Sequence, residues 1–136
     1  MNRESNRKGF SLVEILVVVV IISLLAGLIT PKIIEKFNQA KYNIAKTQVT
    51  VVENSIVDFE RDCNRSPKEL SELLNKPSDI KDDDWKGPYL KQSQLLDPWD
   101  SPFQYRVTPD GVEIISYGKD KREGGDGYNQ DISSKD

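Results

Sequence analysis

The 136-residue chain has no histidine and a single cysteine, Cys63. The absence of histidine excludes catalysis by an imidazole, and together with one cysteine it disfavours a zinc site. One cysteine cannot close an intramolecular disulfide, so a small domain in this chain must be stabilised in another way. We expect Cys63 to be a small buried residue at a helix end, with an intersubunit disulfide as the alternative. No catalytic constellation is present, and we expect no enzyme.

The chain also lacks an excess of positive charge. It carries 19 basic and 22 acidic residues, a formal net charge of -3. Nucleic-acid binding requires a basic surface that neutralises phosphates, so nucleic acid is not expected as a partner. The acidic run Asp82-Asp83-Asp84 is interpreted as a solvated surface.

The most prominent feature of the sequence is a long apolar run near the N-terminus. It follows Arg7, Lys8 and Gly9, and from Ile15 to Ile29 it contains no charged residue. Counted from Phe10, a helix of this length crosses a hydrocarbon core of about 30 Å. A secretory signal peptide would be shorter and would end in a small-x-small cleavage site, which is missing. A plain membrane anchor leaves Glu14 unexplained, because a carboxylate inside a spanning segment is unfavourable.

The motif Gly9-Phe10-Ser11-Leu12-Val13-Glu14 resembles the class III signal of type IV pilins and pseudopilins. The resemblance implies that a prepilin peptidase cuts between Gly9 and Phe10. It also implies that Phe10 becomes the N-terminus, N-methylated in this family, and that Glu14 acts in subunit assembly. Residues 1–9 would then be a leader peptide, 10–30 a transmembrane and assembly helix, and 31–136 the head, which includes the second half of the helix.

Beyond Pro31 the helical pattern continues to about Asp62. Apolar residues recur every three or four positions, as in an amphipathic helix: Ile33, Phe37, Ala40, Ile44, Val51, Val52, Ile56 and Phe59. A break is predicted at residues 63–65. Ser66, Pro67 and Glu69 then predict the capped start of a short second helix. Two alternating segments around a four-residue turn, 108–111, predict a β-hairpin.

Two C-terminal segments extend the family resemblance. Asp97-Pro98-Trp99, followed by an aromatic strand, resembles a region of the major pseudopilin of type II secretion systems, with Asp100 in place of the usual glycine. Trp99 is interpreted as a core anchor. Residues 116–131 combine four glycines with several acidic side chains. By composition alone this segment is either a calcium loop or a flexible acidic turn.

The resemblance favours Ca²⁺, because major pseudopilins carry a C-terminal calcium loop that this segment matches at both ends. Carried over by position, Asp120 and Asp131 are the expected side-chain ligands and Asp126 is a third. Carbonyls near Tyr117 and Arg122 would complete the shell. Lys121 replaces the family's glycine, and Lys121 and Arg122 place two cations beside the expected site.

Together these features predict an α+β, type IV pilin-like fold: a long N-terminal helix, a small antiparallel sheet and a C-terminal metal-binding loop. The resemblance implies a structural subunit of the periplasmic pseudopilus, a helical homo-oligomer that drives the export of folded proteins. It implies a single-pass protein of the bacterial inner membrane with a periplasmic head. Its partners would be the prepilin peptidase, an inner-membrane assembly platform and minor pseudopilins. The alternatives are a type IV pilus subunit, a minor pseudopilin or a membrane-tethered periplasmic domain.

Overall fold

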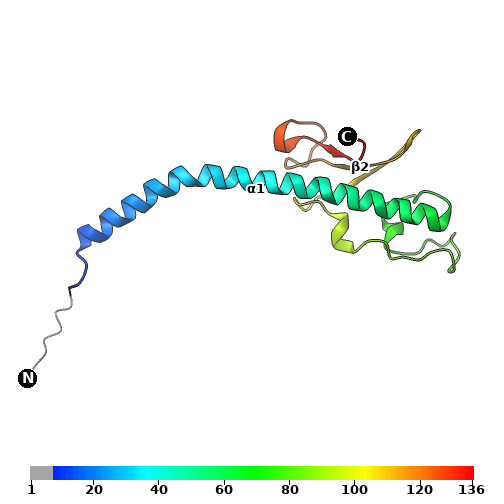
Figure 1. Cartoon of the computed structure of the whole chain (residues 1–136), viewed down its shortest axis with the longest axis horizontal. Helices are drawn as coiled ribbons and strands as arrows, with labels where there is room; N and C mark the ends of the chain where they lie inside the picture. Colours follow the sequence, from blue (N-terminus) through cyan, green and yellow to red (C-terminus); the bar gives the residue numbers. More distant parts are fainter. Residues whose placement is uncertain (1–7) are drawn as a thin grey trace, which may run out of the picture. The chain divides into compact units, whose positions relative to one another are not determined.

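The computed structural model describes residues 8–136, so most of the expected leader lies outside the described residues. One α-helix, α1 (Leu12–Cys63), is followed by two short 3-10 helices, η1 (Leu70–Leu73) and η2 (Gln92–Leu95). The strands are β1 (Gln104–Thr108), β2 (Gly111–Ser116) and β3 (Ile132–Ser133), with the 3-10 turn η3 (Gly127–Asn129) before β3 (Figure 1). The chain divides into two compact units, one ending at Phe37 and one from Asn38 to Asp136.

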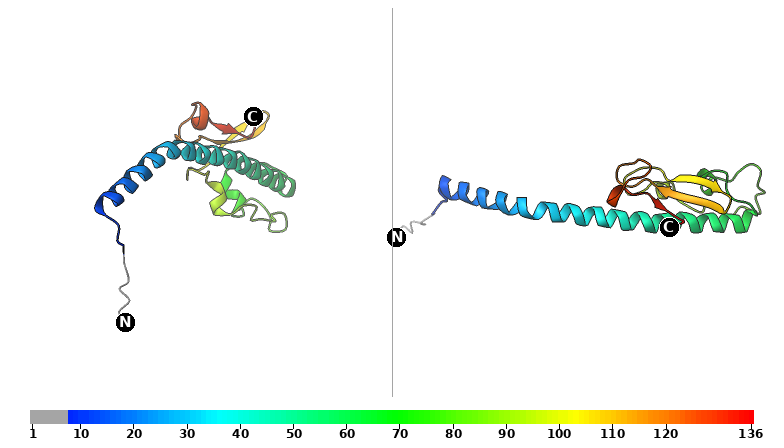
Figure 2. Two further views of the ribbon diagram at one scale, coloured as in Figure 1. Left: turned by 60° about the vertical axis from the view of Figure 1, so that its left-hand side comes forward. Right: turned by 90° about the horizontal axis from the view of Figure 1, so that it is seen from above.

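The core of the second unit is built on one face of α1. The residues of this face are fully or almost fully buried: Ala45, Val49, Val52, Ile56 and Phe59. Of these, only Val52, Ile56 and Phe59 belong to the predicted stripe, and the prediction was wrong for Ile44 and Val51, which are exposed. They pack against Leu73, Trp99, Ile114 and other buried residues of the head. Trp99, predicted as a core anchor, is buried. Within this unit the sheet and the long segment between α1 and β1 flank the helix on different sides (Figures 1 and 2).

The end of α1 confirms the predicted break but not the predicted cap. Asn64 adopts a left-handed backbone conformation (φ 57°), which ends the helix after Cys63. Cys63 is half-buried. The prediction that Ser66 caps a second helix was wrong. The Ser66 hydroxyl donates to a Glu60 carboxylate oxygen at 2.5 Å, and only the short η1 forms, without a side-chain cap.

An ion-pair network links the end of α1 to the segment that follows it. The Arg65 guanidinium lies 2.8 Å from a Glu72 carboxylate oxygen and 3.0 Å from Asp79. Its central carbon also lies 5.4 Å from the centre of the Phe59 ring. The hydrogen bond to Glu72 is the largest of several contacts that raise the pKa of Arg65. Arg65 therefore stays charged and fixes this segment to the core.

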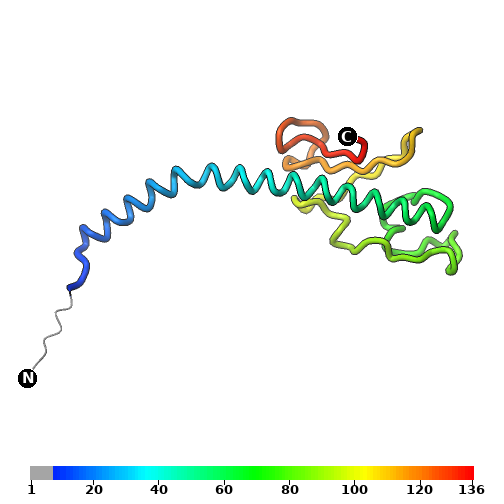
Figure 3. The backbone as a smooth tube through the Cα atoms, in the orientation of Figure 1, coloured from blue at the N-terminus to red at the C-terminus, as the bar shows by residue number. Residues whose placement is uncertain are grey.

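The sheet is antiparallel with strand order β1-β2-β3. Thr108 pairs with Gly111, so the hairpin turn has two central residues, Pro109 and Asp110, rather than the four predicted. Gly111 follows the turn with φ 122°, a conformation that favours glycine. The end of the chain returns beside β2, where Ile132 pairs with Ser116 (Figure 3). This pairing fixes the C-terminal end of the loop 117–131.

The turn after Trp99 explains why the pseudopilin pattern has glycine at the position of Asp100. Asp100 has φ 60°, in the left-handed region that an L side chain adopts at a cost. Its backbone N–H donates to the Asp97 carbonyl at 3.0 Å, so the turn itself is formed. The replacement of glycine by aspartate therefore stores strain and leaves the turn intact.

We expect Asp100→Gly to stabilise the head by about 0.5–1 kcal/mol, because glycine adopts positive φ without a Cβ clash. Chemical denaturation of a soluble head fragment measures this change. Asp83→Gly is the control, since Asp83 is exposed and does not have a positive φ. An equal or lower stability for Asp100→Gly would show that the turn is not strained.

Candidate functional site

The expected processing site lies at the start of α1. Gly9, Phe10 and Ser11 precede the helix and are exposed, Phe10 to 82%. The Ser11 hydroxyl accepts a hydrogen bond from the Glu14 backbone N–H at 3.2 Å and so caps the first turn. The bond between Gly9 and Phe10 thus lies in exposed, non-helical backbone, the form that a peptidase can bind.

The N-terminal part of α1 is an exposed apolar rod with one carboxylate. Its most apolar window has a mean hydropathy of 3.1 and no buried residue, so it is long and apolar enough to span a membrane. The hydroxyls of Ser23 and Thr30 donate to backbone carbonyls one turn earlier, at 2.7 and 2.6 Å. Glu14 lies among apolar residues, in a shallow recess of about 210 Å³ with Phe10, Ile15, Val18 and Val19. Among residues 8–136 no cation lies within ion-pair distance of Glu14.

The backbone of the C-terminal loop turns tightly at its glycines. Gly118, Gly124, Gly125 and Gly127 all have positive φ. A Cβ at Gly118 would lie 2.9 Å from the Gln130 carbonyl oxygen and 3.0 Å from that of Tyr128. Glycine is therefore required at position 118, where two segments of the loop approach closely. Lys121, the residue that replaces the family's glycine, also has positive φ, 59°.

The carboxylates of the loop do not converge as a group of three. Within the described part of the chain, no three Asp, Glu, His or Cys side chains lie together in a way that could hold a metal. One Asp131 oxygen accepts a hydrogen bond from the Gly124 backbone N–H at 2.9 Å. Asp120 accepts one from the Arg122 N–H at 3.1 Å. Asp126 is exposed and makes no side-chain cap to η3.

Asp131 nevertheless has a side-chain oxygen that can serve as a ligand for a cation. Its second carboxylate oxygen is buried and has no hydrogen-bond partner among the described residues. A buried, unpaired charged oxygen is unfavourable unless something compensates it. A calcium ion, which binds a mixture of carboxylate and carbonyl oxygens, is suited to this oxygen and to the carbonyls beside Gly118. The unpartnered oxygen of Asp131 is therefore the atom of the loop that is best suited to bind a cation.

Contacts that the sequence did not reveal attach the loop to the rest of the head. Arg106 of β1 lies 2.8 Å from a Glu123 carboxylate oxygen and donates to the Tyr117 hydroxyl at 3.3 Å. The hydrogen bonds to Glu123 and Tyr117 are the main causes of the raised pKa of Arg106. Tyr128 packs edge-on against Tyr42 of α1, with ring centroids 6.3 Å apart. Neither pair follows a spacing rule, so only the folded structure reveals it.

The start of the loop is attached to the turn that contains Trp99. Asp97 is buried, and one of its oxygens accepts hydrogen bonds from the backbone N–H groups of Trp99 and Ser101. The other accepts one from the Ser116 hydroxyl at 2.7 Å. The turn at Trp99 and the start of the loop, which are far apart in the sequence, are thus joined through one carboxylate.

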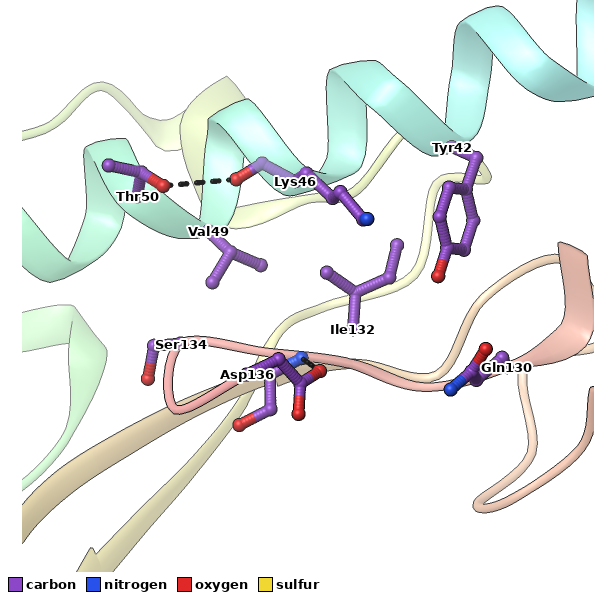
Figure 4. A pocket seen from close by; sticks show the side chains of 9 residues that line it. Tyr42, Lys46, Val49, Thr50, Gln130, Ile132, Ser134 and Asp136 are labelled. Carbon is purple, nitrogen blue, oxygen red and sulfur yellow. Dashed lines mark hydrogen bonds between the residues drawn. The ribbon is translucent and has the colours of Figure 1, made fainter.

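A groove of about 470 Å³ lies between α1 and the C-terminal segment. Figure 4 shows Tyr42, Lys46 and Val49 of the helix pointing toward Ile132 of the C-terminal segment, and Ser134 and Asp136 also line the groove. The Lys46 ammonium lies 5.0 Å from the centre of the Tyr42 ring. This cation–π contact and the packing of Tyr42 against Tyr128 stiffen the wall of the groove beside the loop.

A long helix with an exposed, apolar N-terminal part that is able to span a membrane, together with a small α+β head, defines a pilin-like fold. The fold is similar to the crystal structure of the major pseudopilin from the type 2 secretion system of enterohaemorrhagic Escherichia coli. The TM-score is 0.56 at 20% sequence identity, and the match covers 74% of this chain and 91% of that chain.

Sequence comparisons identify the family. The family model of type II secretion system (T2SS) protein G matches residues 32–135, and the prokaryotic N-terminal methylation motif matches residues 5–30. The type II secretion system core protein G of Xanthomonas campestris is 35% identical over 94% of this chain and 90% of the relative. The core protein G of Pseudomonas aeruginosa is 34% identical over 96% of each chain. The chain therefore belongs to the type II secretion system protein G family, which confirms the resemblance seen in the sequence.

Proposed function

We propose that the chain is a filament-forming subunit that is cut after Gly9 and assembles through its apolar N-terminal helix into a periplasmic pseudopilus. The observation that carries this proposal is the exposed apolar rod with a single carboxylate, Glu14, near its start. Such a surface is unstable in water and must be covered by lipid or by other copies. A membrane holds it before assembly, and neighbouring helices cover it in the filament. The proposed role is structural rather than catalytic.

The proposed cellular location and partners follow from the family of the chain and from its charge distribution. The basic residues before the apolar run favour a cytoplasmic N-terminus, with the rest of the chain on the periplasmic side of the inner membrane. The relatives are core proteins G of type II secretion systems, which supports a role of this chain in such a system. The proposed partners are a prepilin peptidase, which processes the chain, and an inner-membrane platform and minor pseudopilins, with which it assembles. The filament would then drive folded proteins across the outer membrane.

We further propose that the loop 116–131 binds Ca²⁺. The support is the buried oxygen of Asp131 without a partner and the close carbonyls at Gly118. Asp131 and Asp120 would be the side-chain ligands, with Asp126 as a third and with carbonyls from the region of Tyr117 and Arg122. When bound, the ion supplies positive charge that offsets these carboxylates and holds the loop closed. Lys121 and Arg122 are exposed, so solvent screens their repulsion of the ion.

Processing is the first step that can be tested. We expect the mature protein in cells to begin at Phe10, because the Gly9–Phe10 bond is exposed before α1 and because no small-x-small site follows the apolar run. Mass spectrometry of the N-terminal peptide gives the result directly, including any added methyl group. A mature chain that starts near Thr30, or that retains Met1, would contradict the proposal. Gly9→Leu is the control variant and should remain uncut.

A further inference from the structure

Two lysines of the first unit, Lys32 and Lys36, directly follow the apolar run of α1, and both are exposed. Among residues 8–136, no carboxylate lies within ion-pair distance of either ammonium group. Glu35 lies between them in the sequence, and it also forms no ion pair within this part of the chain. The two cations are therefore available to an anion from outside the chain.

The helix places the two lysines on one side, next to an apolar side. Residues four positions apart lie about 6 Å apart along an α-helix and about 40° apart around it, so Lys32 and Lys36 are neighbours on its surface. Ile33, Ile34 and Phe37 are 46%, 52% and 65% exposed and occupy the adjoining side. A partner of this segment must therefore offer apolar surface beside negative charge, a combination found at the surface of an anionic lipid bilayer.

The position of the lysines relative to the apolar run also indicates a lipid. The stretch from Leu12, where α1 begins, to Pro31 is about 30 Å long, which matches the thickness of the hydrocarbon core. The headgroup layer adds about 5–7 Å on each side of this core. Lys32 and Lys36 lie about 2 and 8 Å beyond Pro31 along the helix. The phosphate groups of the lipids are therefore at the level of the two lysines.

The direction of helical side chains brings both ammonium groups to this layer. Side chains of an α-helix lean toward its N-terminus, which here is the membrane side, so the side chain of Lys36 extends back toward the phosphates. Lys32 lies at the edge of the hydrocarbon core. Its apolar stem is stable there, and its charged end favours the polar layer. The two cations thus reach the same layer from opposite directions.

We propose that Lys32 and Lys36 bind the phosphate group of an anionic phospholipid, while Ile33, Ile34 and Phe37 lie at the boundary between headgroups and acyl chains. This proposal rests on the proposed function, because it takes the apolar run as the membrane-spanning segment. The bound lipid fixes the depth of the helix in the membrane. A subunit that leaves the membrane for a filament must release this lipid, so the contact opposes extraction.

Photocrosslinking of the mature chain, which begins at Phe10 and lacks the basic leader, tests the proposal. The bilayer contains equal amounts of phosphatidylglycerol and phosphatidylcholine. Benzoylphenylalanine in place of Phe37 keeps an aromatic ring beside the lysines and forms adducts with nearby lipids, which mass spectrometry counts. We expect phosphatidylglycerol adducts to predominate, because each lysine near an anionic headgroup contributes about a fivefold preference. Lys32→Gln/Lys36→Gln should bring the two adducts to parity.

Lys41→Gln/Lys46→Gln is the matched control. It makes the same change of charge at two exposed lysines that belong to the second unit, so it should leave the adduct ratio unchanged. Glu35→Gln should raise the ratio, because it removes a carboxylate that repels the lipid phosphate. Added salt should lower the ratio, because it screens the attraction between the lysines and the phosphate.

The remaining outcomes separate this proposal from the proposed function. Equal amounts of the two adducts with both lysines present, or an equal loss of preference from the two lysine pairs, would overturn the lipid site and leave membrane anchoring intact. Benzoylphenylalanine in place of Leu24, in the middle of the apolar run, reports insertion itself. A chain that forms no lipid adduct from position 24 does not span the bilayer, and the proposed function would then fail as well.

Discussion

A soluble fragment that begins at Ile33 is expected to melt roughly 10–20 °C higher in calcium than in chelator. The second unit is small and, in the part of the chain that the structure describes, contains no disulfide, so its apolar core alone gives limited stability. Its loop 117–131 contains little apolar material, and one buried oxygen of Asp131 lacks a partner. An ion that binds only the folded state at a hundredfold excess over its Kd contributes about 2.7 kcal/mol.

Substitutions in the loop determine whether the shift comes from this site. Asp131→Ala and Asp120→Ala should each abolish the difference in melting temperature between calcium and chelator. Asp83→Ala removes an exposed carboxylate outside the loop and should leave the difference unchanged. Lys121→Gly should raise the melting temperature in both buffers, because the change relieves a positive φ of the folded loop. Equal melting of the wild-type fragment in both buffers would show that the loop is an acidic turn without calcium.

Glu14→Ala is expected to abolish or strongly reduce filaments while leaving cleavage and the stability of the head unchanged. Cleavage creates an ammonium group at Phe10, and Glu14 has no cation within ion-pair distance among residues 8–136. A neighbouring copy can supply that ammonium. At ~4 Å and an effective dielectric constant near 20, the gross attraction is about 4 kcal/mol. Desolvation offsets part of this attraction.

The control for this prediction separates charge from shape. Glu14→Gln keeps the size of the side chain and removes its charge, so it should be as defective as Glu14→Ala. The N-terminal mass and the melting temperature of the head should match those of the unaltered protein for both variants. Filaments of normal number from Glu14→Gln would show that the carboxylate charge has no role in assembly.

Local patterns predicted much of the fold, and contacts between distant segments were missed. Periodicity gave the helix to its end, because α1 stops at Cys63 where Asn64 turns the backbone. The alternation of apolar and polar residues correctly predicted the hairpin, although its turn is shorter than predicted. The cap at Ser66 was wrong because Glu60, one helical turn before the break, binds its hydroxyl. A side-chain contact with the end of α1, six residues earlier, thus replaced the predicted cap.

The candidate sites also divide into those that a local motif predicts and those that only the folded structure reveals. Short motifs mark Gly9, Phe10 and Glu14, because processing acts on a continuous stretch of chain. Loop composition drew attention to Asp131, but only the fold shows that one of its oxygens is buried without a partner. The pairs Arg106–Glu123 and Asp97–Ser116 join residues 17 and 19 positions apart. No spacing rule links residues at these separations, so their positions depend on the packing of the head.

Electron microscopy of cells that overproduce the unaltered chain together with its secretion components is the most direct test of the central claim. The account predicts thin periplasmic filaments that contain the chain beginning at Phe10, with the apolar helices packed along the filament axis. A processed chain that remains a dispersed, membrane-bound monomer under these conditions would contradict it.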